Sequence, residues 1–108
     1  MEAGKVYVEA TPPSSSTVYG LIGSFTSWTT DVVMSYSGDN VYSVSYNIPQ
    51  NGEWKIRVQG DWSKSWGWNN FTNYVSATKA EDNIKISTAG NYIIYFNPSK
   101  HKICAVKK

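Results

Sequence analysis

The sequence predicts an all-β protein, an antiparallel β-sandwich of about seven or eight strands. Short segments alternate apolar and polar residues at period two, and clusters of Gly, Asn, Asp and Pro separate these segments. No stretch keeps apolar residues at the i, i+3, i+4, i+7 spacing of a helix through three turns. A chain of 108 residues is expected to form one domain with a single modest core.

The alternation is clearest in two neighbouring segments. Along residues 41–48 the inward-facing side chains are expected to be Tyr42, Val44, Tyr46 and Ile48. Along residues 53–59 they are expected to be Trp54, Ile56 and Val58, so that Lys55, Arg57 and Gln59 point outward. This pattern assigns Trp54 to the core, and it places the two basic side chains on the outer face of the same strand.

Further strands are predicted at 5–9, 18–23, 31–36, 83–88, 91–97 and 101–106. Turns are expected at 37–40, 49–52, 89–90 and 98–99, where Gly, Asn and Pro gather. Residues 1–17 are expected to form an N-terminal strand and linker, because residues 11–16 read TPPSSS and make a stiff polar joint. Residues 18–108 would then be the sandwich, with Cys104 as a buried apolar residue.

Residues 60–80 break the strand pattern and are interpreted as one long loop. The segment has little strand character, and it contains the aromatic residues Trp62, Trp66, Trp68, Phe71 and Tyr74. Long loops in compact domains are usually functional or disordered, and disordered segments are poor in aromatic residues. We therefore expect an ordered loop that is packed by its own aromatic side chains.

Composition and charge exclude several classes of protein. The net charge is only +2, and the ten Lys and Arg residues are dispersed, which argues against a nucleic-acid partner. One His, one Cys and scattered acidic residues argue against a metal site, a disulfide framework and a bound cofactor. Glycoside hydrolysis needs two carboxylates, and only Asp61 lies near the aromatic loop, so the protein is not expected to be an enzyme. No apolar run is long enough for membrane insertion.

The feature left to explain is a surplus of aromatic residues, with 5 Trp and 8 Tyr. Some of them belong to the predicted core or sheet faces, namely Tyr42, Tyr46, Trp54, Tyr92 and Phe96. The local excess consists of Trp28 and the cluster of Trp62, Trp66 and Trp68, in segments rich in Gly, Ser, Thr and Asn. Aromatic rings can stack on the C–H faces of sugars, so a neutral carbohydrate is one predicted ligand. The alternative is a structural or protein-docking sandwich, in which these rings pack against a neighbouring domain.

The order of several motifs resembles a known family. The chain reads GSFTSW at 23–28, GEWKIR at 52–57, DWSKSWG at 61–67, DNIKI at 82–86 and GNY at 90–92. This order resembles the starch-binding domains of SusE/SusF-type proteins and the related pullulanase-associated carbohydrate-binding modules. The resemblance covers residues 18–108, nearly the whole chain, and one departure is Ser65, where the family has Asn.

The resemblance implies an immunoglobulin-like sandwich that binds α-glucan without catalysis. The expected ligands are starch, amylopectin, maltooligosaccharides or cyclodextrins. Position by position, it implies a stacking platform of Trp28 and Trp66 with hydrogen bonds from Arg57 and Asn83. Lys55 and Trp68 are additional candidates for the site, and Trp62 is favoured as a structural anchor.

The expected location is the exterior or surface of a bacterial cell. A composition rich in Ser, Thr, Asn and Tyr and poor in charge, 17% of residues, is typical of extracellular bacterial proteins. The family resemblance implies the same location, with the module tethered to further binding or catalytic modules of a larger secreted or anchored protein.

Overall fold

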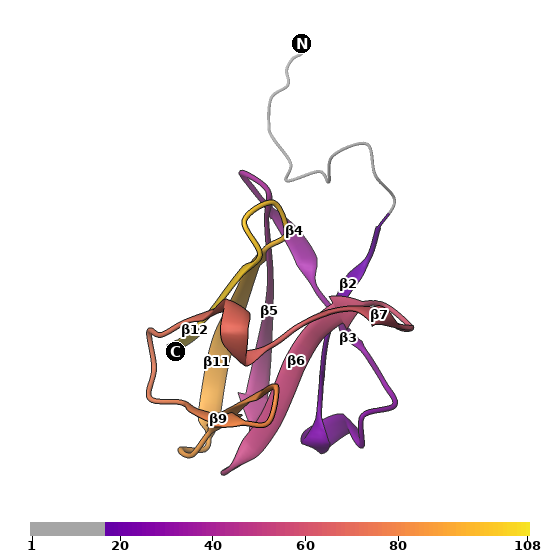
Figure 1. Ribbon diagram of the computed structural model, residues 1–108. Coiled ribbons are helices and arrows are strands. Elements are labelled where there is room, and N and C mark those ends of the chain that lie inside the picture. Colours follow the sequence, from indigo (N-terminus) through magenta and orange to yellow (C-terminus); the bar gives the residue numbers. More distant parts are fainter. Residues whose placement is uncertain (1–16) are drawn as a thin grey trace.

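The computed structural model describes residues 17–108 as a β-sandwich of two sheets packed face to face (Figure 1). This confirms the predicted fold class. The strand expected at 5–9 and the joint at 11–16 lie outside the described residues. Within the described part there are eleven strands, β2 to β12, instead of seven or eight. The higher number arises because the segment predicted at 31–36 is divided into two strands, β3 and β4, and because β7, β8 and β9 were not predicted.

The first sheet carries the candidate site. Its strands, in spatial order, are β3 (Val32–Val33), β2 (Tyr19–Gly23), β6 (Gly52–Val58), β10 (Asn83–Ile86) and β9 (Thr78–Ala80). A further strand, β7 (Asp61–Trp66), also pairs with β6. On the edge of β6 away from β2, the first half of the strand pairs with β10 and the second half with β7. Lys55 therefore lies at the junction where the pairing of β10 ends and that of β7 begins.

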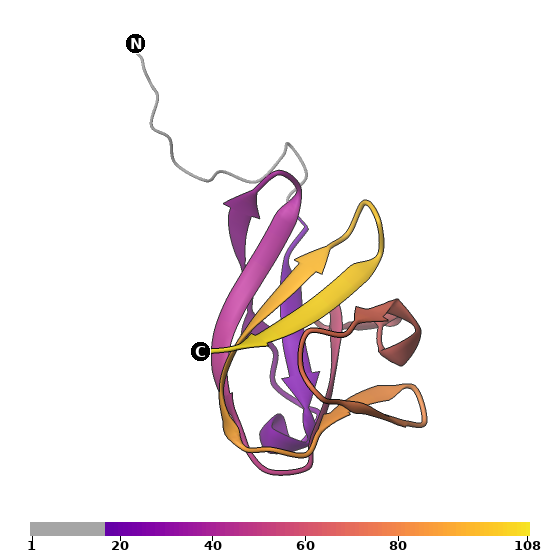
Figure 2. The same ribbon diagram turned by 90° about the vertical axis from the view of Figure 1, so that its left-hand side faces the viewer.

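The second sheet closes the other side of the core. Its strands, in spatial order, are β4 (Ser35–Gly38), β5 (Val41–Ile48), β11 (Gly90–Asn97), β12 (Lys102–Lys107) and β8 (Phe71–Thr72). The pairing of β8 with β12 is parallel, and the other pairings in this sheet are antiparallel. Figure 2 shows the two sheets from the side, with the segment around residues 67–80 (dark orange) projecting to the right of them.

The core lies between the sheets and follows the predicted alternation. Its largest fully buried side chains are Trp54, Tyr92, Phe96, Leu21, Ile48, Ile56, Ile84, Ile86, Ile94 and Ile103. Full burial of an aliphatic or aromatic side chain of this size contributes about 1.5–3 kcal/mol. Cys104 corrects an expectation, since it is only half-buried. It alternates with the buried residues Ile103 and Ala105, so its side chain lies on the outer face of β12.

The segment 60–80 is not one long loop, which corrects the prediction. It contains β7, a 3-10 turn η2 (Trp68–Asn70), β8 and β9. A tight turn at Gly60, with a φ of 76°, lets β7 fold back onto β6. The strand was missed because a bulge interrupts its alternation. The partner of Arg57 is Ser65 and that of Val58 is Asp61, so three residues of β7 have no register partner in between.

Candidate functional site

Two indoles lie side by side over the outer face of the first sheet. The ring centroids of Trp28 and Trp62 are 6.1 Å apart, and the ring planes are inclined by 44°. With four polar residues they line a shallow hollow of about 260 Å³, which we call the indole groove: Trp28, Lys55, Trp62, Glu81, Asp82 and Asn83. Trp62 is 47% exposed, an unusual fraction for so large an apolar side chain.

Trp28 is presented by a compact turn that starts at the end of β2. The 3-10 turn η1 (Ser24–Thr26) is closed by the Thr26 hydroxyl, which accepts from the Gly23 amide and donates to the Gly23 carbonyl. The Trp28 amide donates to the same Gly23 carbonyl at 3.0 Å. These bonds hold Trp28 at a φ of 57°, in the left-handed region, which costs an L-residue about 1–2 kcal/mol. Strained backbone of this kind is concentrated at functional sites.

Trp62 is presented by the bulge in β7. Strict alternation would place Trp62 and Trp66 on the same face of β7. Residues 62–64 have no register partner on β6, and this break lets Trp62 face outward while Trp66 faces inward. The Asp61 carboxylate anchors the bulge by accepting hydrogen bonds from the amide and hydroxyl of Ser63, and these bonds lower the pKa of Asp61. Beneath the ring, the guanidinium carbon of Arg57 lies 4.6 Å from the ring centroid of Trp62, a cation–π contact.

Arg57 differs from the sequence-based expectation. It does lie on the outer face of β6, but it is only 6% exposed. Its Nε donates to Asp31 Oδ1 at 2.7 Å and its Nη2 donates to Asp31 Oδ2 at 2.8 Å. The hydrogen bond with Asp31 raises the pKa of Arg57. The N–H groups of Nε and Nη2 are therefore bonded within the protein, and the guanidinium of Arg57 supports the ring of Trp62 from below.

The absence of a side chain at Gly20 makes room for this ion pair. Gly20 is the register partner of Arg57 on β2, and a Cβ atom there would lie 2.7 Å from Cβ of Asp31. The amide of Gly60 adds a third hydrogen bond to Asp31, to Oδ2 at 3.2 Å. Asp31 thus bonds to β6 through Arg57 and to the turn before β7 through Gly60, and it packs closely on Gly20 of β2. The segment after β2 carries Trp28 and β7 carries Trp62, so Asp31 links the parts of the chain that present the two indoles.

Asn83 lies at the groove with Trp28, as the family resemblance implied, and so does Lys55, which was a candidate because it shares the outer face of its strand with Arg57. Lys55 is half-buried, with its register partner Ile22 on the same outer face. The amide nitrogen Nδ2 of Asn83 donates to Oε1 of Glu53 at 3.1 Å. That bond orients the side-chain amide and leaves its oxygen as the group that can accept from a ligand.

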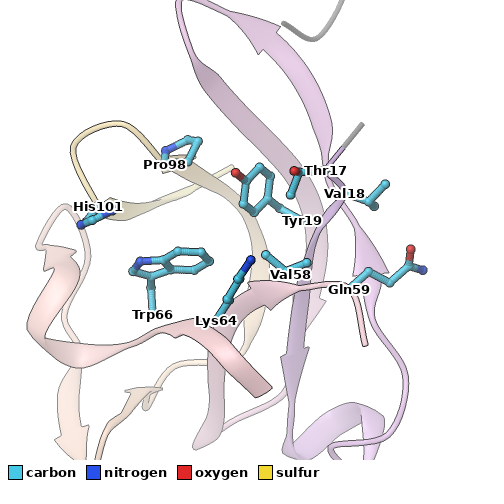
Figure 3. Close-up of a pocket in the computed structure, with 9 residues that line it drawn as sticks. All are labelled: Thr17, Val18, Tyr19, Val58, Gln59, Lys64, Trp66, Pro98 and His101. Carbon is cyan, nitrogen blue, oxygen red and sulfur yellow. The ribbon is translucent and has the colours of Figure 1, made fainter. Parts of the chain in front are cut away.

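Trp66 lies in a different place from its predicted partner Trp28. Its register partner is the core residue Ile56, so the ring turns inward and lies 4.7 Å from the ring of Phe96. Its remaining surface lines a separate pocket of about 500 Å³ with Tyr19, Lys64 and His101 (Figure 3). The structure therefore does not form the expected platform of Trp28 and Trp66, and the ring beside Trp28 is that of Trp62.

Trp68 also packs on its own segment. Its ring stacks on that of Phe71 with centroids 5.8 Å apart and an angle of 26° between the planes. It lines a second hollow that adjoins the indole groove at Lys55 and Asp82. Trp68 thus lies beside the groove without adding a ring to the pair.

Sequence reasoning missed three parts of the site. It assigned Trp62 to structural anchoring, and it identified neither Asp31 as the partner of Arg57 nor the groove acids Glu81 and Asp82. A signal for Trp62 was present in the order Gln59-Gly60-Asp61, a turn that would start a hairpin and so bring the following residues back over β6. Asp31 carries no comparable signal, because its ion pair depends on how β2 and β6 align.

Comparison with known proteins adds no identification. No family model matches the chain, and no curated protein matches it significantly.

Among residues 17–108 no cluster of three or more His, Cys, Asp or Glu side chains could hold a metal ion. In the same part of the chain, no helix has the length and apolar character needed to cross a membrane.

Proposed function

We propose that the protein is a non-catalytic carbohydrate-binding module that binds α-glucan in the indole groove. The observation that carries the proposal is the pair of accessible indoles, Trp28 and Trp62, inclined by 44°. Two neighbouring sugar units of a curved glucan present C–H faces in two different directions, which matches two inclined rings. A flat, extended polysaccharide would instead need rings in one plane.

The polar residues of the groove suit a neutral polyol. Lys55 provides hydrogen-bond donors, Glu81 and Asp82 provide acceptors, and Asn83 provides an oriented amide oxygen. Sugar hydroxyls both donate and accept, so they can use all of these groups. The two carboxylates would repel a phosphate backbone, and this favours a sugar over a nucleic acid.

The backbone at Trp28 supports a binding role for its ring. A bulky residue in the left-handed region is a genuine outlier, and Gly or Asn would fill this position at lower cost. Nothing in the packing of the core requires an indole here, since Trp28 is outside the core cluster. Use of the ring by a ligand explains why Trp occupies a position that disfavours it.

A shallow groove with few contacts should bind weakly. We expect Kd values of roughly 10 µM to 1 mM for maltooligosaccharides and cyclodextrins, which corresponds to about 4–7 kcal/mol. Tethering to other modules of an extracellular or cell-surface protein would raise the apparent affinity for starch and amylopectin. The proposed partner is therefore a polymer surface held at several points.

Native affinity electrophoresis in gels containing amylopectin tests the proposal. The wild-type protein should be retarded, and Trp28→Ala and Trp62→Ala should each lose most of the retardation. Tyr74→Ala is the matched control, because Tyr74 is a 71% exposed aromatic residue outside the groove, and it should migrate like wild type. Unretarded wild type would overturn the proposal and favour the alternative of a structural or protein-docking domain.

A further inference from the structure

A second hollow of about 200 Å³ continues the indole groove. It shares Lys55 and Asp82 with the groove, and its other lining residues are Ser65, Gly67, Trp68, Asn69 and Asn70. We call it the amide hollow. Because the two hollows have a side chain of β6 and the residue before β10 in common, a chain lying on the indoles can pass from one to the other without leaving the surface.

The amide hollow is held in shape by hydrogen bonds that close η2 and tie it to the residue before β10. The amide of Trp68 donates to the carbonyl of Asp82 at 2.9 Å. The amide of Gly67 donates to Oδ1 of Asn70 at 3.2 Å, and the amide of Asn70 donates back to the carbonyl of Gly67 at 2.9 Å. These bonds order the residues that line the hollow before any ligand arrives, which reduces the entropy cost of binding.

The chemistry of the amide hollow differs from that of the indole groove. The ring of Trp68 is stacked on Phe71, so the hollow is lined chiefly by hydrogen-bonding groups. The Ser65 hydroxyl and the exposed side-chain amide of Asn69 can both donate and accept, and Lys55 can donate. Such a set matches the hydroxyl edge of a sugar ring and offers little to an apolar ligand.

We infer that the amide hollow is an additional glucan subsite, which binds the sugar unit next to those stacked on the indoles through hydrogen bonds alone. The inference rests on the proposed function. Lys55 reaches both neighbouring units, and Asn69 and Ser65 contact only the additional one. Affinity therefore depends on chain length beyond the two units that cover the rings.

Isothermal titration with maltose, maltotriose, maltotetraose and maltohexaose tests the subsite. For wild type we expect affinity to rise roughly tenfold from maltose to maltotriose, as two or three additional hydrogen bonds allow, and then to level off in the longer sugars. Asn69→Ala and Ser65→Ala should retain the affinity for maltose and lose most of this increase. Trp62→Ala should weaken the binding of every ligand, which separates the two kinds of contact.

A spectroscopic measurement keeps the test independent of any loss of folding. The side-chain amide resonances of Asn69 in the wild-type protein should shift with maltotetraose and stay unchanged with maltose. A wild-type protein that binds maltose and maltotetraose equally, or an Asn69→Ala variant with an unchanged length dependence, would overturn the subsite and leave the proposed function intact. A wild-type protein that binds none of these sugars overturns the proposed function and the subsite with it.

Discussion

Arg57 donates to both carboxylate oxygens of Asp31, at 2.7 and 2.8 Å, and the two side chains are only 7% and 6% exposed. The guanidinium also lies under the ring of Trp62. The pair joins β6 to the segment before β3, on the outer face of the sheet and outside the main core. It therefore forms the floor on which the exposed indole is held.

Removal of either partner should destabilise the fold. Arg57→Ala and Asp31→Ala should each lower the free energy of unfolding by about 3–5 kcal/mol, because each leaves an uncompensated charge in a desolvated position. The double variant should lose less than the sum of the two single losses. Urea denaturation measures this, with the exposed Lys64→Ala as a control that should stay within about 0.5 kcal/mol of wild type. Full additivity would contradict a direct coupling between the two residues.

Glycine at position 28 should be tolerated better than alanine. Both substitutions remove the indole, but Gly adopts a φ of 57° without strain and Ala does not. We expect Trp28→Gly to be more stable than Trp28→Ala by about 1 kcal/mol, the reverse of the usual order in regular structure. Thermal or urea unfolding of the two variants gives the difference, and their equal loss of glucan binding serves as the internal control. A Trp28→Ala variant that is more stable than Trp28→Gly would contradict a left-handed conformation at residue 28.

The strands with sustained alternation could be predicted from the sequence, and β7, β8 and β9 could not. The strand at 41–48 coincides with β5, because eight residues of clean alternation identify one buried face. By contrast, β8 has two residues and β9 has three, too few for any periodicity. β8 forms through pairing with a partner distant in the sequence, Phe71 with Ile103, so no local signal specifies it. β9 pairs with the neighbouring β10, Ala80 with Asn83, but its three residues show no alternation that would identify the hairpin.

The site was predictable in its residue types and only partly in its geometry. Trp28 and Asn83 line one groove, as the ordered motifs implied, and Lys55, a candidate from the alternation of its strand, lines it with them. The choice between Trp62 and Trp66 as the second ring depends on a bulge that reverses which side chain faces outward. A bulge follows from how two strands fit, and a single sequence read at period two places both tryptophans on the same face.

Trp66 should matter for stability more than for sugar binding. Its ring packs on Phe96 and Tyr19 at the margin of the core, so Trp66→Ala should lower the free energy of unfolding by about 2–4 kcal/mol. Retardation by amylopectin should persist at a temperature where the variant remains folded. Trp66→Phe, which keeps an apolar ring, should recover about half of the lost stability. Loss of retardation in well-folded Trp66→Phe would move the binding site to the pocket shown in Figure 3.

A methyl group at Gly67 should disturb the amide hollow without touching the indoles. A Cβ atom there would overlap the carbonyl oxygen of Asp82 and lie 3.0 Å from Cε of Lys55. We expect Gly67→Ala to cost about 1–3 kcal/mol of stability, because backbone atoms must move apart. In the folded variant the Trp68 amide should exchange with solvent faster, since its bond to Asp82 is strained. Hydrogen exchange followed by NMR measures this, and unchanged protection at Trp68 would contradict the close contact.

Burial raises the pKa of the Cys104 thiol above its ordinary value, and a smaller opposing effect comes from its hydrogen bond with Thr72. A raised pKa means that the folded state disfavours the thiolate. The contribution to stability is therefore fully present below the pKa of the unfolded chain, about 8.5, and is lost as the pH rises through the higher pKa of the folded state.

Urea denaturation from pH 7 to 9.5 should accordingly show wild type losing stability relative to Cys104→Ala above about pH 8.5, with a constant difference below it. Native protein at pH 8 should also react with iodoacetamide more slowly than urea-unfolded protein, because less of its thiol is ionised and accessible. Burial of the tyrosines raises the pKa of Tyr19 and Tyr42 as well, and their ionisation affects wild type and the variant equally. A difference between the two proteins that stays constant up to pH 9.5 would contradict the raised pKa of Cys104.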